Sequence, residues 1–414
     1  MVAENRTELT YRYERWRAIS AGIIETAGST FLILIAVRWY QAGSIAKALV
    51  ASGSSVGLIC SPLLVSRVES SKKPIATAAS RVAAAGALGF LAMAFVSLEP
   101  VFVLGAILAM ACASVAVPLL TQIYQENYPE QERGRRFSRT VIIRIAAAAL
   151  FSELAGRVLS HRINHFPALL VVFAGAFVFA SYCLGKIPSR PLSASGGTHP
   201  FRALKYARDD TLFRQTLIAW MFLGFANLMM VPLRVEYLAN PKYGITLHGA
   251  VPTVGAIAFL TGVLPNVARL LMNPLWGWLF DRMNFFLLRV MLNFGFMLGI
   301  LTFFTSDSLP GLVLGAVFYG ISIAGGDVAW SLWVTKFAPP ERVADYMAVH
   351  TFFTGVRGVV APLVAFQLAS VLPLKAVGWI SAGLIFIGSA ILVPEIKLGR
   401  AGRRAAALVE EISD

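Results

Sequence analysis

The chain has 414 residues, of which 57% are hydrophobic and only 14% are charged, and its mean hydropathy is +0.69. Soluble domains usually carry about 25% charged residues, so this composition excludes an ordinary soluble protein. The net charge of +14 would suit a nucleic-acid partner. Lys and Arg are, however, concentrated in alternate loops between apolar segments, which is what membrane insertion requires and argues against nucleic acid.

Twelve apolar segments follow one another along the chain, and each is long enough to cross a bilayer as a helix. A β-barrel would instead show alternating segments of about 10 residues. The sequence therefore predicts an all-α polytopic membrane protein. Its spans are expected at 18–38, 44–66, 75–97, 101–124, 140–160, 167–186, 213–235, 250–280, 286–305, 310–335, 345–371 and 374–394.

A longer, partly Pro/Ser/Gly-rich segment, 187–212, separates the first six spans from the last six. We expect it to be a cytoplasmic linker between the N-terminal six-helix bundle, 18–186, and the C-terminal six-helix bundle, 213–394. The bias of Lys and Arg places the tails, 1–17 and 395–414, in the cytoplasm. We expect a monomer that lies in the lipid bilayer of a bacterial inner membrane.

The two halves of the chain resemble each other in their loops. YPEQERGRRFSRT follows the fourth span and FAPPERVADYMAV follows the tenth, so that Glu132–Arg133 corresponds to Glu341–Arg342. SPLLVSRVES at 61–70 aligns with NPLWGWLFDR at 273–282, which places Glu69 opposite Asp281. Two six-helix repeats joined by a linker are typical of secondary transporters with parallel halves.

With these features the chain resembles the major facilitator superfamily of secondary transporters. The family's inner-loop motif, a Gly followed four residues later by Asp-Arg, is matched by Gly277, Asp281 and Arg282. In the first half Val65 replaces the Gly and Glu69 the Asp. The resemblance implies alternating access between two bundles. It also implies that the second span packs near the eleventh and the fifth near the eighth, and that the first, fourth, seventh and tenth line a central cavity.

From this resemblance we expect a cytoplasmic gate in the inner loops. Gly277 should let two helices approach closely, and Asp281 should meet a positive helix end or an Arg of a neighbouring loop. The contact would hold the inner side closed and break when the bundles rock. The expected gate residues are Gly277, Asp281, Arg282, Glu69, Glu132, Arg133, Glu341 and Arg342.

Charged residues deep inside a span are candidates for function, because each is costly in hydrocarbon without a partner. Arg81 and Arg144 lie near the inner boundary, where a long side chain can reach the headgroups. Glu25 and Asp327 are expected in the cavity as proton-coupling carboxylates. Glu153 and Arg269 are expected at matching depth on facing spans, where we predict that they pair between the bundles.

Arg357 is the candidate for holding an anionic group of the solute, with a backbone carbonyl or Asp327 as its alternative partner. Further substrate-cavity candidates are Gln122, Asn227, Trp330 and Trp333, although packing roles suit each of them as well. No phosphate-binding loop, metal-ligand cluster or nucleophile arrangement is evident. The sequence therefore predicts neither a cofactor nor a metal site, and no enzyme activity.

We therefore expect a secondary active transporter that moves a small solute, coupled to protons. The arginines within spans favour an anionic or zwitterionic solute. Glu25 and Asp327 favour the alternative, efflux of cationic or apolar compounds by proton antiport. Two alternatives come from other classes: a membrane-embedded lipid-modifying enzyme, which needs clustered His, Asp or Ser, and a transporter-like sensor, which would tolerate the altered first-half motif.

Overall fold

The structure is a computed structural model that describes residues 2–192, 204–247, 249–333 and 343–413. Apart from two isolated bridges, these residues form helices and their connections. The helices of the first half are α1 (Val2–Thr26), the π-helical turn η1 (Ala27–Phe31), α2 (Leu32–Arg38), α3 (Ser44–Ser71), α4 (Ile75–Phe95), α5 (Glu99–Val115), α6 (Val117–Asn127), α7 (Glu130–His161), the 3-10 turn η2 (Ile163–His165) and α8 (Phe166–Lys186).

The second half begins with the short helix α9 (Lys205–Asp209). Its other elements are α10 (Thr211–Ala239), the 3-10 turn η4 (Pro241–Tyr243), α11 (Val254–Ala258), the π-helical turn η5 (Phe259–Val263), α12 (Leu264–Arg282), α13 (Phe285–Thr305), α14 (Leu309–Leu332), α15 (Val343–Val371) and α16 (Leu374–Ser413). Pro62, Pro232, Pro274, Pro362 and Pro394 lie inside helices, as membrane helices tolerate when neighbouring groups satisfy the freed carbonyls.

The predicted spans correspond to these helices in order. The first span is α1, η1 and α2 joined end to end, the fourth is α5 with α6, and the eighth is α11, η5 and α12. Among the described residues, 11 helical segments are long and apolar enough to cross a membrane. The remaining predicted span is α7, a long helix of 32 residues whose mean hydropathy is lowered by its Arg and Glu side chains.

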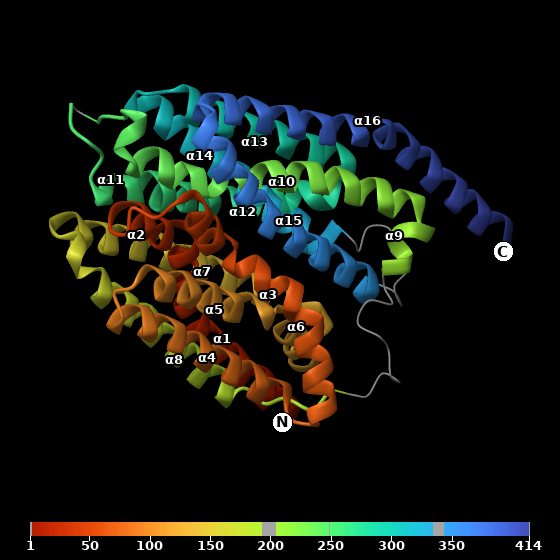
Figure 1. Cartoon of the computed structure of the whole chain (residues 1–414). Coiled ribbons are helices and arrows are strands. Elements are labelled where there is room, and N and C mark those ends of the chain that lie inside the picture. The colour runs from red at the N-terminus through yellow and green to blue at the C-terminus, as the bar shows by residue number, and fades with distance from the viewer. Residues whose placement is uncertain (1, 193–203, 248, 334–342, 414) are drawn as a thin grey trace.

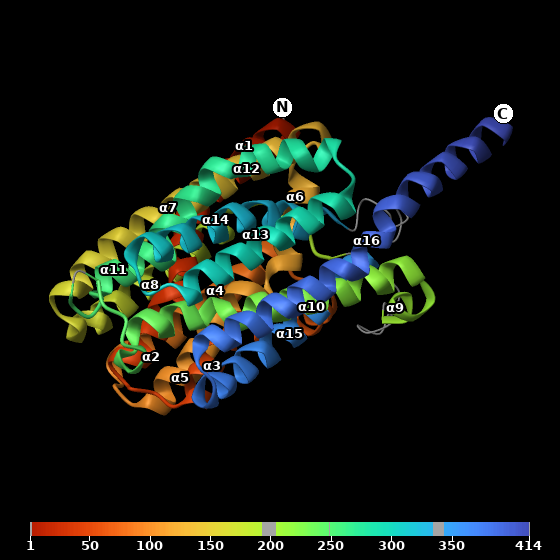
Figure 2. The same cartoon turned by 90° about the horizontal axis from the view of Figure 1, so that it is seen from above.

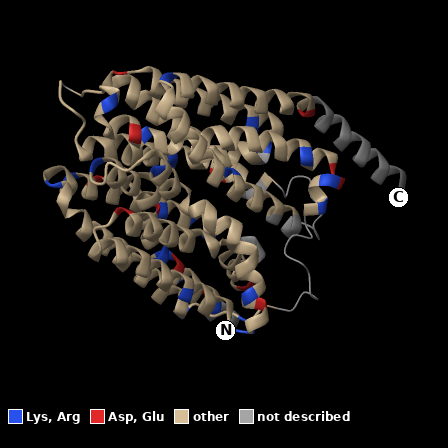
Figure 3. Ribbon diagram, in the orientation of Figure 1, with Lys and Arg blue, Asp and Glu red and all other residues tan. Residues whose placement is uncertain are grey.

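The helices form two bundles, which Figure 1 shows as a red-to-yellow half and a green-to-blue half lying side by side. Their ribbons converge at the end that holds α2 and α11. They diverge toward the opposite end, which holds α6, α9 and both termini (Figure 1). Figure 2, seen from above, shows the long helices of both bundles running in roughly the same direction. Figure 3 shows helix bodies that are mostly uncharged, with a few charged positions between the bundles.

Close packing within the first bundle depends on small residues of α3. A Cβ on Gly53 would lie 2.8 Å from the Cβ of Met110 on α5, and one on Gly57 would collide with the Ala111 carbonyl of the same helix. The two glycines are four residues apart and therefore lie on one helix face. Their small-xxx-small spacing brings the backbones of α3 and α5 together, as in other membrane helix pairs.

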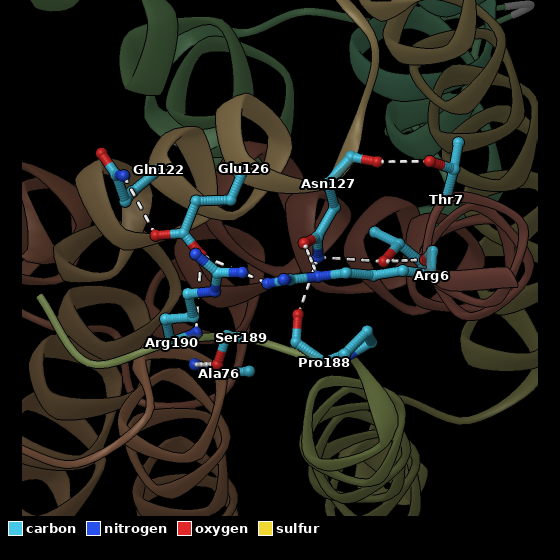
Figure 4. A network of polar contacts seen from close by, with 10 residues as sticks. Arg6, Thr7, Ala76, Gln122, Glu126, Asn127, Pro188, Ser189 and Arg190 are labelled. Carbon is cyan, nitrogen blue, oxygen red and sulfur yellow. Dashed lines mark hydrogen bonds and ion pairs between the residues drawn. The ribbon is translucent and has the colours of Figure 1, made fainter. Parts of the chain in front are cut away.

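The polar N-terminal segment is not a free tail, because residues 2–17 form the first turns of α1. Figure 4 shows the contacts that anchor it to α6 and to the start of the linker. Arg6 Nε donates to Asn127 Oδ1 at 2.6 Å, and Thr7 Oγ1 donates to the Asn127 carbonyl at 2.7 Å. Asn127 Nδ2 donates to the Pro188 carbonyl at 2.8 Å. Asn127 thus joins three segments that are distant in the sequence.

We predict that Asn127→Ala destabilises the protein, because it removes the side-chain hydrogen bonds of Asn127 with Arg6 and the Pro188 carbonyl from a side chain that is 3% exposed. Buried groups that lose their partners cost about 1–3 kcal/mol each. The midpoint of thermal unfolding in detergent should fall by several degrees. Thr121→Ala is the control, because the exposed Thr121 hydroxyl bonds only to the Val117 carbonyl of its own helix. Equal midpoints for the two variants would contradict this role for Asn127.

Candidate functional site

The two bundles meet along the helix pairs that the resemblance implies. The second span, α3, packs against the eleventh, α15, and the fifth span, α7, packs against α11, η5 and α12 of the eighth. Small residues set the first contact: a Cβ on Gly355 would lie 2.7 Å from Ile59 Cγ1, and one on Gly358 would collide with Ser55. Ser52 Oγ also donates to the Val359 carbonyl at 3.3 Å.

A chain of four alternating charges crosses the seam between the bundles. Arg144 on α7 and Glu25 on α1 belong to the first bundle, and their Nε and Oε2 atoms lie 3.2 Å apart. Arg269 on α12 belongs to the second bundle; its Nη1 donates to Glu25 Oε1 at 2.6 Å. The same guanidinium donates through Nε to Asp327 Oδ2 on α14, also at 2.6 Å.

Arg269 is the buried centre of this chain. Its side chain is 6% exposed, whereas those of Arg144, Glu25 and Asp327 are 35%, 32% and 34% exposed. A buried guanidinium needs charged or polar acceptors, and the two carboxylates together with Asn266 Oδ1, at 3.4 Å, supply them. Water-sized molecules can reach the carboxylates, although these lie well inside spanning helices. The site therefore combines a buried cation with two accessible acids.

Two predictions about these charges are wrong in this structure. Glu153 does not pair with Arg269; its Oε1 instead accepts from Nε of Arg157, one turn along α7, at 2.5 Å. The register of α7 explains this, because Ser152 and Gly156 face Gly262 and Gly255. Arg269 lies seven residues beyond Gly262, or about 10 Å along the helix. Arg144, expected to extend to the headgroups, pairs with Glu25 instead. Arg81 is exposed, and its headgroup contact stays a prediction.

On the side of this chain away from the termini, further contacts join the bundles. The π-helical turns η1 and η5 face each other there, and the Oγ1 atoms of Thr30 and Thr261 are 3.3 Å apart. π-Helical turns often occur at functional positions in helices. Lys47 Nζ on α3 donates to Glu236 Oε1 on α10 at 2.7 Å, and both side chains are buried. These polar contacts close the seam on that side.

Arg357, Trp330 and Trp333 do not lie in the charge chain. Arg357 is 5% exposed, and its Nη1 donates to the backbone carbonyl of Trp220 on α10 at 2.6 Å, which is one of the two partners expected for it. Trp333 is fully buried, with its ring centroid 5.7 Å from that of Trp220. The half-buried Trp330 lies 5.5 Å from the ring of His350.

Gln122 and Asn227 also lie apart from the charge chain. Gln122 Nε2 donates to Glu126 Oε1 at 3.1 Å, at the edge of the network in Figure 4. Asn227 lines a small cavity of about 10 Å³ with Arg234 and Tyr319. The guanidinium carbon of Arg234 lies 3.5 Å from the centre of the Tyr319 ring, a close cation–π contact. The cavity is large enough for about one water molecule.

The expected gate residues are only partly described. Among the described residues, nothing lies within 4 Å of a Cβ built on Gly277, so none of them makes the expected close approach. Arg282 lies over the ring of Trp278, 4.4 Å from its centre. The Glu69 carbonyl accepts from the Lys72 amide at the end of α3. Outside the described residues lie Glu341, Arg342 and the side chains of Asp281 and Arg133.

Glu132, another expected gate residue, pairs within its own helix. Its Oε2 accepts from Nε of Arg136 at 2.8 Å, and Arg136 Nη2 also donates to Glu8 Oε1 on α1 at 2.7 Å. The hydrogen bond and the charge of Arg136 lower the pKa of Glu132. The described part of this loop therefore joins α7 to α1 within the first bundle and does not join the two bundles.

Sequence reasoning missed five charged residues that the structure places in buried contacts: Glu14, Lys47, Arg234, Glu236 and Arg289. Each lies near the end of an expected span, where a long side chain can usually reach water. Their position along the chain therefore gave no signal. Only the packing of neighbouring helices over them shows that they are enclosed. Among the described residues, no group of three or more His, Cys, Asp or Glu could hold a metal ion.

No family model matches the chain, and no curated protein matches it in sequence. Solved structures share its architecture. The nucleoside transporter NupG has a TM-score of 0.71 and 15% identity, over 93% of this chain and 99% of that chain. A POT family transporter in complex with 5-aminolevulinic acid has a TM-score of 0.68 and 12% identity, over 94% of this chain and 96% of that chain. The D-xylose-proton symporter has a TM-score of 0.61 and 17% identity, over 95% of this chain and 96% of that chain.

The chain is thus an integral membrane protein built from two bundles of spanning helices. It has the same fold as these solved structures, the all-α fold of two helical bundles that the sequence predicted.

We predict that Arg269→Gln destabilises the protein, because Glu25 and Asp327 would then face each other without the cation between them. Breaking a buried pair costs about 3–5 kcal/mol, and the partial exposure of both acids reduces this to about 1–3 kcal/mol. Thermal unfolding in detergent measures the loss. Adding Glu25→Gln should recover part of it, whereas the control Arg157→Gln, on an exposed pair, should change little. Additive effects of the two substitutions at 25 and 269 would argue against the contact.

Proposed function

We propose that the protein is a secondary active transporter that moves a small solute across the membrane by alternating access between its two bundles. The observation that carries this proposal is the ion pair of Glu25 with Arg269, which joins the bundles in the middle of spanning helices. Charges placed there are costly, and in membrane proteins they mark pathways and proton relays. The fold supports the same conclusion, since the similar structures named above are those of transporters.

Proton coupling follows from the way in which Glu25 and Asp327 share one cation. With both acids ionised, Arg269 is held from both bundles at once. A proton on Glu25 removes one charge from the pair and weakens the link between the bundles, while Asp327 still neutralises Arg269. Proton binding therefore lowers the free energy needed to separate the bundles at this link. The side chains of both carboxylates are about one-third exposed, which supports proton exchange at these positions.

The structure fits one of the two states of an alternating-access cycle. If both termini lie in the cytoplasm, as the distribution of Lys and Arg indicates, the contacts of Thr30 with Thr261 and of Lys47 with Glu236 lie on the outer side. The bundles diverge toward the inner side (Figure 1). We infer an inward-facing state in which these outer contacts must break before the site can face outward.

For the solute we propose an anionic or zwitterionic molecule, because Arg269 and Arg144 offer cations next to accessible acids. Efflux of cationic or apolar compounds is the second candidate, favoured by Glu25 and Asp327. A transporter-like sensor would share the fold but carry no flux. Proteoliposomes with a pH-sensitive dye inside distinguish these: solute-dependent proton movement supports transport, and the panel of solutes that produces it separates the two classes of solute.

We predict that Glu25→Gln uncouples protons from the solute, because glutamine cannot exchange a proton. Proton movement that depends on solute should be lost in proteoliposomes, while exchange of labelled solute for unlabelled solute persists. Glu153→Gln is the matched control, since Glu153 pairs only with Arg157 at the edge of the bundle contact. Unchanged proton movement in Glu25→Gln would remove Glu25 from the coupling mechanism.

We further predict that a disulfide between cysteines at positions 30 and 261 stops transport. The Oγ1 atoms of Thr30 and Thr261 are 3.3 Å apart, so cysteines at these positions bring two sulfur atoms close together across the seam. The T30C/T261C protein, made without Cys60, Cys112 and Cys183, should lose transport on oxidation and regain it on reduction.

The control for this crosslink joins two helices of one bundle. Ser80 and Ser181 have their Oγ atoms 3.0 Å apart, on α4 and α8. The S80C/S181C protein should therefore keep its transport when oxidised. Full activity of the crosslinked T30C/T261C protein would show that the two bundles do not separate on this side during transport.

A further inference from the structure

The second bundle encloses a cluster of basic side chains around one indole ring. Arg289 on α13 and Arg357 on α15 both lie near Trp220 on α10, with their guanidinium carbons 3.6 Å and 6.0 Å from the ring centre. His350, two turns before Arg357 on α15, has its ring centroid 5.1 Å from that of Trp220. Arg289, Arg357 and His350 are 2%, 5% and 0% exposed. Three groups that can carry positive charge are therefore buried together.

These side chains have few partners within the described part of the chain. The Arg357 Nη1 bond to the Trp220 carbonyl is one hydrogen bond, and this acceptor is uncharged. Arg289 Nη1, Arg357 Nε and both ring nitrogens of His350 are buried without a hydrogen-bond partner. The ion pairs of the described residues include neither arginine. This contrasts with Arg269, which has two carboxylates.

An arginine stays charged in proteins, so neither side chain can escape the cost of burial by losing its proton. The indole ring provides cation–π attraction, but this attraction is weaker than the desolvation cost of a buried ion. Two like charges close together add repulsion. An anion between them would remove both costs, and the planar fork of a guanidinium matches the oxygen atoms of carboxylate or phosphate.

We propose that Arg289, Arg357 and His350 form an oxyanion-binding site, for a carboxylate or phosphate group, that is separate from the charge chain at Arg269. Trp220 and Trp333 form its apolar walls, each 5.1 Å from His350 between ring centroids. Trp330 also contacts His350, and it is half-buried, whereas Trp220 and Trp333 are buried. Anion binding at this site does not require transport, so the proposal can be tested independently of the proposed function.

The test uses the full-length protein in detergent at constant ionic strength. Inorganic phosphate, acetate and benzoate are titrated against chloride while thermal unfolding and tryptophan fluorescence are recorded. Binding to the folded state raises the unfolding midpoint in a saturable way. It also changes the emission of the indoles that line the site. A response to phosphate alone indicates a tetrahedral ligand, and a response to acetate or benzoate indicates a carboxylate; either supports the site.

Variants locate the response. Arg289→Met and Arg357→Met should each weaken the apparent affinity about tenfold or more, since each removes a charge-assisted hydrogen bond. Without anion, Arg289→Met should unfold at the same or a higher temperature than the wild type, because it removes an uncompensated buried charge. A residue kept only for packing would give a lower midpoint. Arg289→Lys, which keeps the charge, covers the case in which the Met variant does not fold.

Two controls keep the outcome clear. Arg81→Met changes an exposed arginine of the first bundle and should leave the anion response intact. Arg269→Gln tests the other cationic site. The proposal is overturned if no anion gives a saturable response in the wild type. It is also overturned if Arg289→Met and Arg357→Met keep the response, or if Arg269→Gln abolishes it while they do not.

Discussion

The structure depends on the requirement that charge inside a bilayer must be neutralised. Arg269 meets this requirement with one carboxylate from each bundle, so the solution of a local electrostatic problem also becomes a link between the two halves of the molecule. The link is made of ion pairs whose acids are about one-third exposed. A seam sealed only by apolar packing would hold the bundles together without offering a proton any means to release them.

The seam is closed by two kinds of contact. Small residues on α3 and α15 let backbones approach closely, at positions such as Gly355 and Gly358. Polar pairs, such as Lys47 with Glu236, add directional contacts across the seam. The paired π-helical turns η1 and η5 lie between these polar contacts and the charge chain. The helices of the seam are thus irregular next to its most charged part.

The basic cluster around Trp220 presents the opposite situation to Arg269. Both sites enclose guanidinium groups. Among the described residues, Arg269 pairs with two carboxylates, whereas the arginines around Trp220 contact only aromatic rings and one backbone carbonyl. The same physical requirement that explains the contacts of Arg269 therefore points to a ligand at Arg289 and Arg357. The comparison of the two sites needs no assumption about the solute, since it rests on charge balance alone.

The sequence by itself determined the class of fold, because the length of the apolar segments and the alternation of basic loops follow from bilayer thickness and insertion. It also singled out Glu25, Arg269 and Asp327 as costly charges. Only the tertiary structure decided their partners. The register of α7 against the eighth span differs from the predicted one by about two helical turns, so Arg269 pairs with Glu25 and Glu153 pairs with Arg157. Likewise, the packing of neighbouring helices buries Arg289, whose position near the end of an expected span did not indicate burial. Pairing and burial depend on helix register and rotation, which a one-dimensional pattern does not fix.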